Sequence, residues 1–437
     1  MKVYKIKKRV RELIFDFNDH YPTFGKLLVI GWGVLHKTKF LLKKKFFNSR
    51  NKLEFGPSDI KLNKILWVNP KNILFKLKTD ISNDSSGILG GDWDFLVENI
   101  ESMHIYQAFK QRFHENQEWD KIKHLNLVKD QISKGEEVIG CRNIEDFNKK
   151  LEDFEILFKK LENTNDSLKK IYVLNNTDIG SPAKINEISV VINRKGHFIL
   201  LGGEFGFFIV LLLGITKVPV RIVSRHKEWA EFKRTIYHFT NNYAGKKIYQ
   251  RLTHPDLEDI PYKYGDERFN LIKANLSAKR GKLLDIGSNL GYFCRKFEDE
   301  GFECQATEAN QLYIEFLKKL RDAEHKKFKV FPKSIFLFRK NEELEYDIIL
   351  AIFIFHHFIL RKNTFENLKK LLGRIKTKEL YFGVHSFDEY KNNKHVYMNF
   401  NQEQFVNFIL ENSCLNHAER LIVYESGRAL YKLTSTD

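Results

Sequence analysis

The sequence is poor in cysteine, and the four cysteines that it has are scattered. Cys141, Cys294, Cys304 and Cys414 form no Cys-x-x-Cys pair, and no Cys/His cluster has the spacing of zinc ligands. We therefore expect a reducing compartment and no structural metal.

Targeting and membrane-spanning segments are also lacking. The basic start is not followed by a clean apolar core and a small-residue cleavage site, so no secretory signal is expected. The apolar run at residues 198–215 is broken by Gly202-Gly203 and contains Glu204, and Gly214 limits its helix to about ten residues. These features predict a buried helix between two strands, in a cytoplasmic protein.

The chain has 437 residues, of which 43% are hydrophobic and 30% are charged, as in soluble globular proteins of two or three domains. Its net charge of +17 is concentrated in an N-terminal arm, residues 1–70, where Lys and Arg outnumber Asp and Glu by 16 to 5. Such an arm can bind nucleic acid, contact an anionic membrane surface as a peripheral partner, or form a solvated basic face. All three interpretations stay open.

Residues 71–235 are expected to form a second domain. Apolar side chains recur at helical spacing from Ile144 to Leu161, which predicts a packing helix. Residues 188–192 and 198–201, separated by the turn Asn193-Arg-Lys-Gly196, predict a β-hairpin.

The stretch from Glu187 to Trp229 resembles the ParB/sulfiredoxin-like fold, an α+β fold. The resemblance rests on the hairpin turn, the Gly-Gly loop, a helix ending in Leu-Leu-Gly214, and Val218-Pro-Val-Arg221. In that family the helix usually starts with His-Arg facing phosphate or nucleotide, where this chain has Phe205 and Gly206. The resemblance therefore implies a retained scaffold whose ligand site is lost; the alternative is a domain that binds nucleic acid together with the arm.

A nucleotide-type binding turn follows in residues 236–437. Lys282–Ile286 reads as a buried strand, Gly287 and Gly291 as parts of a loop, and residues 292–298 as a helix. This order brings backbone N–H groups and a helix N-terminus to a ligand. A dinucleotide fingerprint would need glycine at Asn289 and Tyr292, so NAD is disfavoured.

The pattern Asp-x-Gly-x-x-x-Gly from Asp285 to Gly291 resembles the first motif of class I methyltransferases. The resemblance implies an α/β fold with a Rossmann-like seven-stranded sheet and S-adenosylmethionine as cofactor, held by Asp285, Gly287, Ser288, Asn289 and Gly291. Asp285 would organise the loop or meet the ammonium group. A second strand, residues 302–307, ends in Glu308, whose carboxylate is placed to accept hydrogen bonds from the ribose hydroxyls.

The apolar run Tyr346–Phe353 predicts the central fourth strand, with Phe353 at its end beside the cofactor. His356 and His357 follow. They can act as a general base, or they cap the next helix or support the loop. Residues 379–384 predict strand five, with His385 as a further candidate, and residues 421–424 and 428–432 predict a closing antiparallel hairpin.

The acceptor is inferred from absences and from resemblance. The Asn/Asp-Pro-Pro-Tyr/Phe motif of enzymes that methylate exocyclic amines of DNA bases is missing, and so is the Pro-Cys pair of cytosine enzymes. Residues 354–357 resemble the loops of enzymes that methylate small molecules, sugars or lipid-linked precursors. We therefore expect O-methylation of a small hydroxylated acceptor, such as a glycan or surface-polysaccharide precursor, with a nucleic-acid-binding protein as the rival interpretation.

Overall fold

The computed structural model describes residues 64–79, 81, 87–163, 188–242, 245–389 and 396–435. The chain divides into two compact units, of which the first ends at Arg234 and the second comprises residues 195–197 and 235–437. Within the described ranges, no helix is long and apolar enough to cross a membrane. The predicted basic arm lies outside the described residues except for residues 64–70, so its partners stay a prediction.

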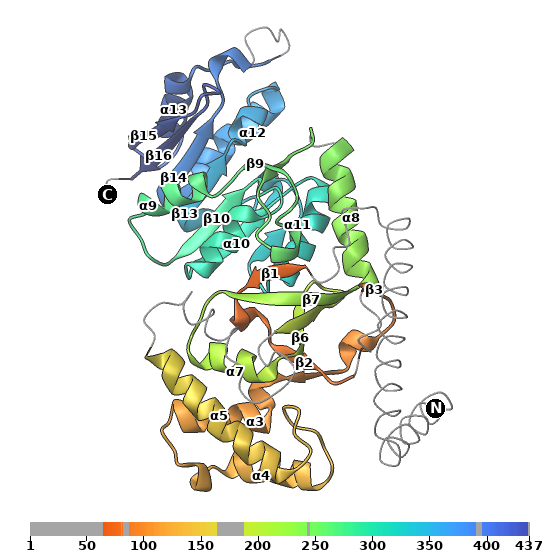
Figure 1. Ribbon diagram of the computed structural model, residues 1–437. Helices are drawn as coiled ribbons and strands as arrows, with labels where there is room; N and C mark the ends of the chain where they lie inside the picture. Colours follow the sequence, from red (N-terminus) through yellow and green to blue (C-terminus); the bar gives the residue numbers. More distant parts are fainter. Residues whose placement is uncertain are drawn as a thin grey trace, which may run out of the picture. The chain divides into compact units, whose positions relative to one another are not determined.

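The first unit is built on a seven-stranded mixed sheet (Figure 1). The strand order is β1-β7-β5-β6-β2-β4, and β3 pairs with β7. The strands are β1 (Ile65–Val68), β2 (Phe75–Leu77), β3 (Gly87–Leu89), β4 (Val97–Asn99), β5 (Ser189–Ile192), β6 (Phe198–Gly202) and β7 (Val218–His226). The antiparallel pair β5–β6 confirms the predicted hairpin.

The helices of this unit are α3 (His104–Phe113), α4 (Lys123–Ser133), α5 (Ile144–Glu162) and α7 (Glu204–Leu212), and α8 (Lys227–Asn242) crosses the boundary of the units. The predicted packing helix is α5, and its Phe154 ring lies 3.9 Å from that of Phe109 on α3. The predicted buried helix is α7, in which Phe205 and Gly206 are buried. No polar side chain therefore occupies the two positions that carry His-Arg in ParB-like proteins, and kinship with that family stays a prediction.

The second unit contains a seven-stranded sheet of order β12-β11-β10-β13-β14-β16-β15. Its strands are β10 (Lys282–Ile286), β11 (Glu303–Thr307), β12 (Lys329–Phe331), β13 (Leu344–Ile352), β14 (Ile375–Val384), β15 (His417–Val423) and β16 (Ala429–Thr434). The first five in spatial order are parallel, and β16 runs antiparallel to β14 and β15. This is the predicted Rossmann-like methyltransferase fold, including the closing hairpin.

Both faces of this sheet are covered by helices. Successive residues of a strand point to opposite faces of the sheet and pack into two different hydrophobic cores. Leu283, Ile348 and Leu350 pack with α9 (Glu267–Ala274), α10 (Tyr292–Asp299) and α11 (Gln311–Ala323). Leu284 and Ile349 pack with α12 (Lys362–Arg374) and α13 (Gln402–Glu411). Continuous apolar runs such as β13 follow from this two-sided burial.

The segment before α9 contains a small two-stranded parallel sheet of β8 (Ile248–Gln250) and β9 (Tyr262–Tyr264). Two residues separate Tyr264 from α9, which packs on the main sheet through Phe269 and Ile272. The tyrosines of β8 and β9 therefore belong to the second unit.

Candidate functional site

The loop after β10 adopts the backbone conformation that its glycines allow. Gly287, Asn289 and Gly291 have positive φ values of 70°, 53° and 74°, and Gly291 is the N-cap of α10. A Cβ on Gly287 would lie 2.7 Å from Cδ1 of Ile354, so no other residue fits there without displacing that side chain. The N–H groups of Gly287 and Ser288 both donate to the carbonyl oxygen of Thr307, at 2.9 and 3.0 Å.

Glu308 joins this loop to the end of β11. Its Oε2 accepts the N–H of Asn289 at 2.8 Å, and its Oε1 accepts those of Ala309 and Asn310, each at 2.8 Å. A carboxylate offers about four acceptor positions, so roughly one remains for a ligand hydroxyl. The predicted ribose ligand thus also fixes the loop, a role that the sequence pattern does not reveal.

A pocket opens at the carboxyl ends of β10, β11, β12 and β13. Its empty volume is about 310 Å³, and it is lined by Ile286, Gly287, Thr307, Glu308, Ala309, Lys333, Ser334, Ile335, Ile354 and Phe358. The pocket lies at the switch point between β10 and β13, where open parallel sheets bind their ligands. Among the described residues, the buried hydroxyl groups of Ser288 and Thr307 have no hydrogen-bond partner.

Asp285 is placed differently from the expectation. It is only 2% exposed, and among the described residues its one hydrogen-bond partner is the Sγ of Cys294, at 4.0 Å. Among the described residues, no amide of the loop donates to Asp285, whereas the N–H of Asn289 donates to Glu308. The cofactor-binding role considered for Asp285, which includes contact with the ammonium group, stays a prediction. Burial, together with the charge of Glu308, raises the pKa of Asp285 to about 8.

The three candidate histidines gather at the ends of β13 and β14. The ring centroid of His356 lies 4.0 Å from that of His357 and 5.7 Å from that of His385. His356 and His385 are buried, and burial followed by neighbouring charges lowers the pKa of His356 to about 2; burial likewise lowers that of His385 to about 4. His357 is exposed, and partial desolvation lowers its pKa as well. Of the three, only His357 is accessible to an acceptor.

Phe353 directly follows β13 and has a positive φ of 56°. It does not line the pocket, whereas the next residue, Ile354, does. The Phe353 ring instead lies near two guanidinium groups, 4.5 Å from Cζ of Arg268 and 5.3 Å from Cζ of Arg428. Neither arginine was predicted, because both lie outside the sequence motifs. Lys333 and Ser334, which follow β12 and line the pocket, were not predicted either.

No group of three or more His, Cys, Asp or Glu that could hold a metal ion occurs within the described part of the chain. The absence of a structural metal was expected from the sequence, and it stays a prediction. The pocket suits an organic ligand better, because it combines apolar walls with a few polar groups.

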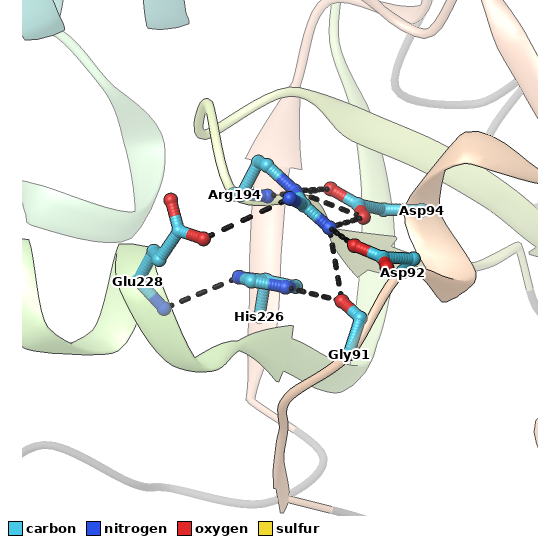
Figure 2. A network of polar contacts seen from close by, with 6 residues as sticks. All are labelled: Gly91, Asp92, Asp94, Arg194, His226 and Glu228. Carbon is cyan, nitrogen blue, oxygen red and sulfur yellow. Dashed lines mark hydrogen bonds and ion pairs between the residues drawn. The ribbon is translucent and has the colours of Figure 1, made fainter.

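The first unit holds a separate polar network around Arg194 (Figure 2). The guanidinium donates to the buried carboxylate of Asp94 at 2.7 Å, to Asp92 at 2.8 Å and to the carbonyl oxygen of Gly91 at 2.9 Å. His226 also contacts the carbonyl oxygen of Gly91, at 2.9 Å. Burial raises the pKa of Asp94, but the hydrogen bonds of Arg194 outweigh it and leave the pKa below its ordinary value. This network holds residues 91–94 against Arg194, in the turn after β5.

No family model matches the chain, and no curated protein matches it. Solved structures that resemble it include the bifunctional kinase-methyltransferase WbdD, at 19% identity over 43% of this chain and 44% of that chain, with a TM-score of 0.35. The PH0226 protein from Pyrococcus horikoshii OT3 is 12% identical over 46% of this chain and 99% of that chain, with a TM-score of 0.35.

A further resemblance is to an S-adenosylmethionine-dependent methyltransferase from Clostridium acetobutylicum ATCC 824, 10% identical over 39% of this chain and 89% of that chain, with a TM-score of 0.31. The chain spans less than half the length of WbdD. At these identities and TM-scores the resemblances decide neither activity nor substrate.

Proposed function

We propose that the second unit is an S-adenosylmethionine-dependent methyltransferase. The observation that carries this proposal is that Gly287 and Glu308 meet in one pocket at the switch point of the sheet. Gly287 leaves room for the close approach of a ligand to the backbone. Glu308 has an acceptor position left for a ribose hydroxyl, and Ile335, Ile354 and Phe358 offer an apolar surface to an adenine ring.

When bound, the cofactor would supply a methyl group already activated on a sulfonium. The protein then has to position an acceptor oxygen and take up its proton. His357 is the residue we propose for the proton, because it is exposed and its lowered pKa keeps the imidazole neutral at pH 7. His356 and His385 are buried behind it, and we assign them to holding the His357 turn, residues 355–357.

The acceptor that we propose is a small hydroxylated molecule such as a glycan or a surface-polysaccharide precursor. Support comes from the absence of the base-methylating motifs in the sequence and from an accessible imidazole suited to deprotonating a hydroxyl. Transfer of labelled methyl from the cofactor to sugar nucleotides or glycan extracts tests this part. Labelling of nucleic acid instead of glycan would refute it.

Calorimetric titration of the full chain with S-adenosylmethionine and S-adenosylhomocysteine tests the cofactor. We expect binding by the parent and at least about tenfold weaker binding by Glu308→Ala, because a hydrogen bond to a charged group contributes about 1.5–3 kcal/mol. Glu303→Gln, at the other end of β11 and exposed, is the matched control and should bind like the parent. A folded parent that binds neither ligand would refute the proposal.

A further inference from the structure

Among the described residues, one buried arginine without a carboxylate partner contacts Phe353, the residue before Ile354 of the pocket. Arg268, on α9, is 2% exposed. Its Nη1 donates to the phenol oxygen of Tyr249 at 3.1 Å, while its Nε has no hydrogen-bond partner. Within the part of the chain that the structure describes, no Asp or Glu forms an ion pair with it. The positive charge is thus buried without a neutralising group.

Aromatic rings surround this guanidinium. Its Cζ lies 3.4 Å from the ring centroid of Tyr264, 4.5 Å from that of Phe353, 5.1 Å from that of Tyr424 and 5.4 Å from that of Tyr249. Ring faces attract a cation, but they compensate only part of the cost of removing it from water. Burial raises the pKa of Tyr264, yet hydrogen bonding to Lys263 and the charge of Arg268 outweigh burial and lower it.

A second arginine faces the same phenylalanine. Arg428 precedes β16, and its Cζ lies 5.3 Å from the Phe353 ring. Its Nη2 pairs with Oε1 of Glu389 at 2.7 Å, so its own charge is balanced. Among the described residues, Arg268 has no such partner. The two arginines near Phe353 therefore have one carboxylate partner between them, that of Glu389, which pairs with Arg428. The pair can hold one further negative charge.

Phe353, which both arginines contact, is next in the chain to a residue of the pocket. Phe353 is followed by Ile354, which both lines the pocket and packs on Gly287. Gly383 of β14 lies against Phe353, since a Cβ there would be 2.6 Å from the Phe353 nitrogen. Phe353 therefore lies against β14 and directly after the carboxyl end of β13, where the pocket opens.

We propose that the methyl acceptor carries an anionic group, a carboxylate or a phosphate ester, which Arg268 and Arg428 bind beside Phe353. The inference rests on the proposed methyltransferase function and specifies its substrate class. The planar fork of a guanidinium suits both anions, and the surrounding tyrosines can donate to their oxygens.

Thermal unfolding of the full chain in different anions tests the site without any cofactor. Inorganic phosphate and acetate, compared with chloride at equal ionic strength, should raise the melting temperature of the parent by about 2–4 °C at saturating anion. Arg268→Met should lose this rise, and should melt in chloride no lower than the parent because it removes an uncompensated buried charge. Arg428→Gln, at a partly exposed position, should reduce the rise even if Arg268→Met does not fold.

Arg374→Gln is the matched control. Arg374 donates to the carbonyl oxygens of Glu342 and Phe338 at 2.8 and 2.9 Å and stands at the opposite end of β14. It should keep the full anion response. A parent that melts equally in chloride, phosphate and acetate overturns the inference, and so does an undiminished response in both Arg268→Met and Arg428→Gln.

The chemical arms of the test use glucose 6-phosphate, glucuronate and glucose as probes in the same unfolding experiment. We expect glucose 6-phosphate and glucuronate to raise the melting temperature and glucose to leave it unchanged. The anionic probe that gives the larger rise tells whether the site prefers phosphate or carboxylate. Equal rises with all three probes overturn the inference. Calorimetry with S-adenosylmethionine separates the two proposals. Cofactor binding without an anion response refutes only the anionic acceptor, whereas an anion response without cofactor binding refutes the proposed function and the acceptor role with it.

Discussion

The carboxylate of Glu308 accepts the backbone N–H of Asn289 at 2.8 Å, and this contact joins the loop after β10 to the end of β11. Both of its oxygens accept backbone N–H groups, so an amide in its place would turn an NH₂ group toward a donor. We therefore expect Glu308→Gln to weaken cofactor binding about as much as Glu308→Ala does. Calorimetry on the two variants checks this, and parent-like binding by Glu308→Gln would show that the amide contacts are dispensable.

Gly287→Ala should abolish cofactor binding and lower stability by about 1–3 kcal/mol, because its Cβ would meet Ile354 and its φ is positive. Gly301→Ala is the matched control: its φ of 90° is also positive, but nothing lies within 4 Å of the added Cβ. Gly301→Ala should lose only the smaller part of the stability, which is the cost of the strained backbone conformation. The double variant Gly287→Ala with Ile354→Ala should recover part of the binding. Equal losses in Gly287→Ala and Gly301→Ala would contradict the steric explanation.

The protonation of Asp285 predicts how stability depends on pH. Its folded-state pKa is raised from 3.8 to about 8, so between these values the folded state holds a proton that the unfolded chain has released. Stability conferred by this group is full at low pH and is lost as pH rises through this window. Asp285→Asn should remove that slope, and its melting temperature should exceed the parent's increasingly from pH 5 to pH 9. Parallel melting curves of the two proteins would refute this assignment.

His357→Gln should lower kcat by about 10²–10⁴ and leave cofactor affinity unchanged, because its exposed imidazole is proposed to take up a proton. The imidazole acts as a base only when neutral, and its pKa is below 6.5; activity should therefore persist below pH 6.5 and fall only at more acidic pH. His417→Gln, at an exposed position on β15, is the control. If His357→Gln retains full activity, the base is another group.

In the first unit, Asp94→Asn should destabilise the fold by about 2 kcal/mol, since it leaves Arg194 without its buried partner. Asp92 contacts the same guanidinium at a similar distance, but its side chain is 81% exposed, against 2% for Asp94. Asp92→Asn should therefore cost much less. Urea unfolding of the two variants compares them, and cofactor affinity should change in neither.

The sequence predicted those parts of the fold that local patterns encode. The apolar run of β13 indicated a strand covered on both faces, residues 282–286 indicated the buried strand β10, and Glu308 was recognised by its place after β11. Each of these signals is carried by residues close together in the chain.

The remainder of the site depends on contacts between distant segments. Arg268 comes 85 residues before Phe353 and 160 before Arg428, so no local pattern indicates that they meet. Asp285 belongs to a readable motif, but its burial against Cys294 and its raised pKa arise from packing across α10. The same limit applies to His356 and His357, which are adjacent in sequence while one is buried and the other exposed.

The contact between Gly287 and Ile354 has a consequence for how this protein can change over evolutionary time. The two positions lie on different loops, yet the space that one side chain fills is the space that the other must leave empty. A lineage that acquires a side chain at position 287 must shorten the residue at position 354 to keep the pocket open. Substitutions at these two sites are therefore expected to be inherited as a pair.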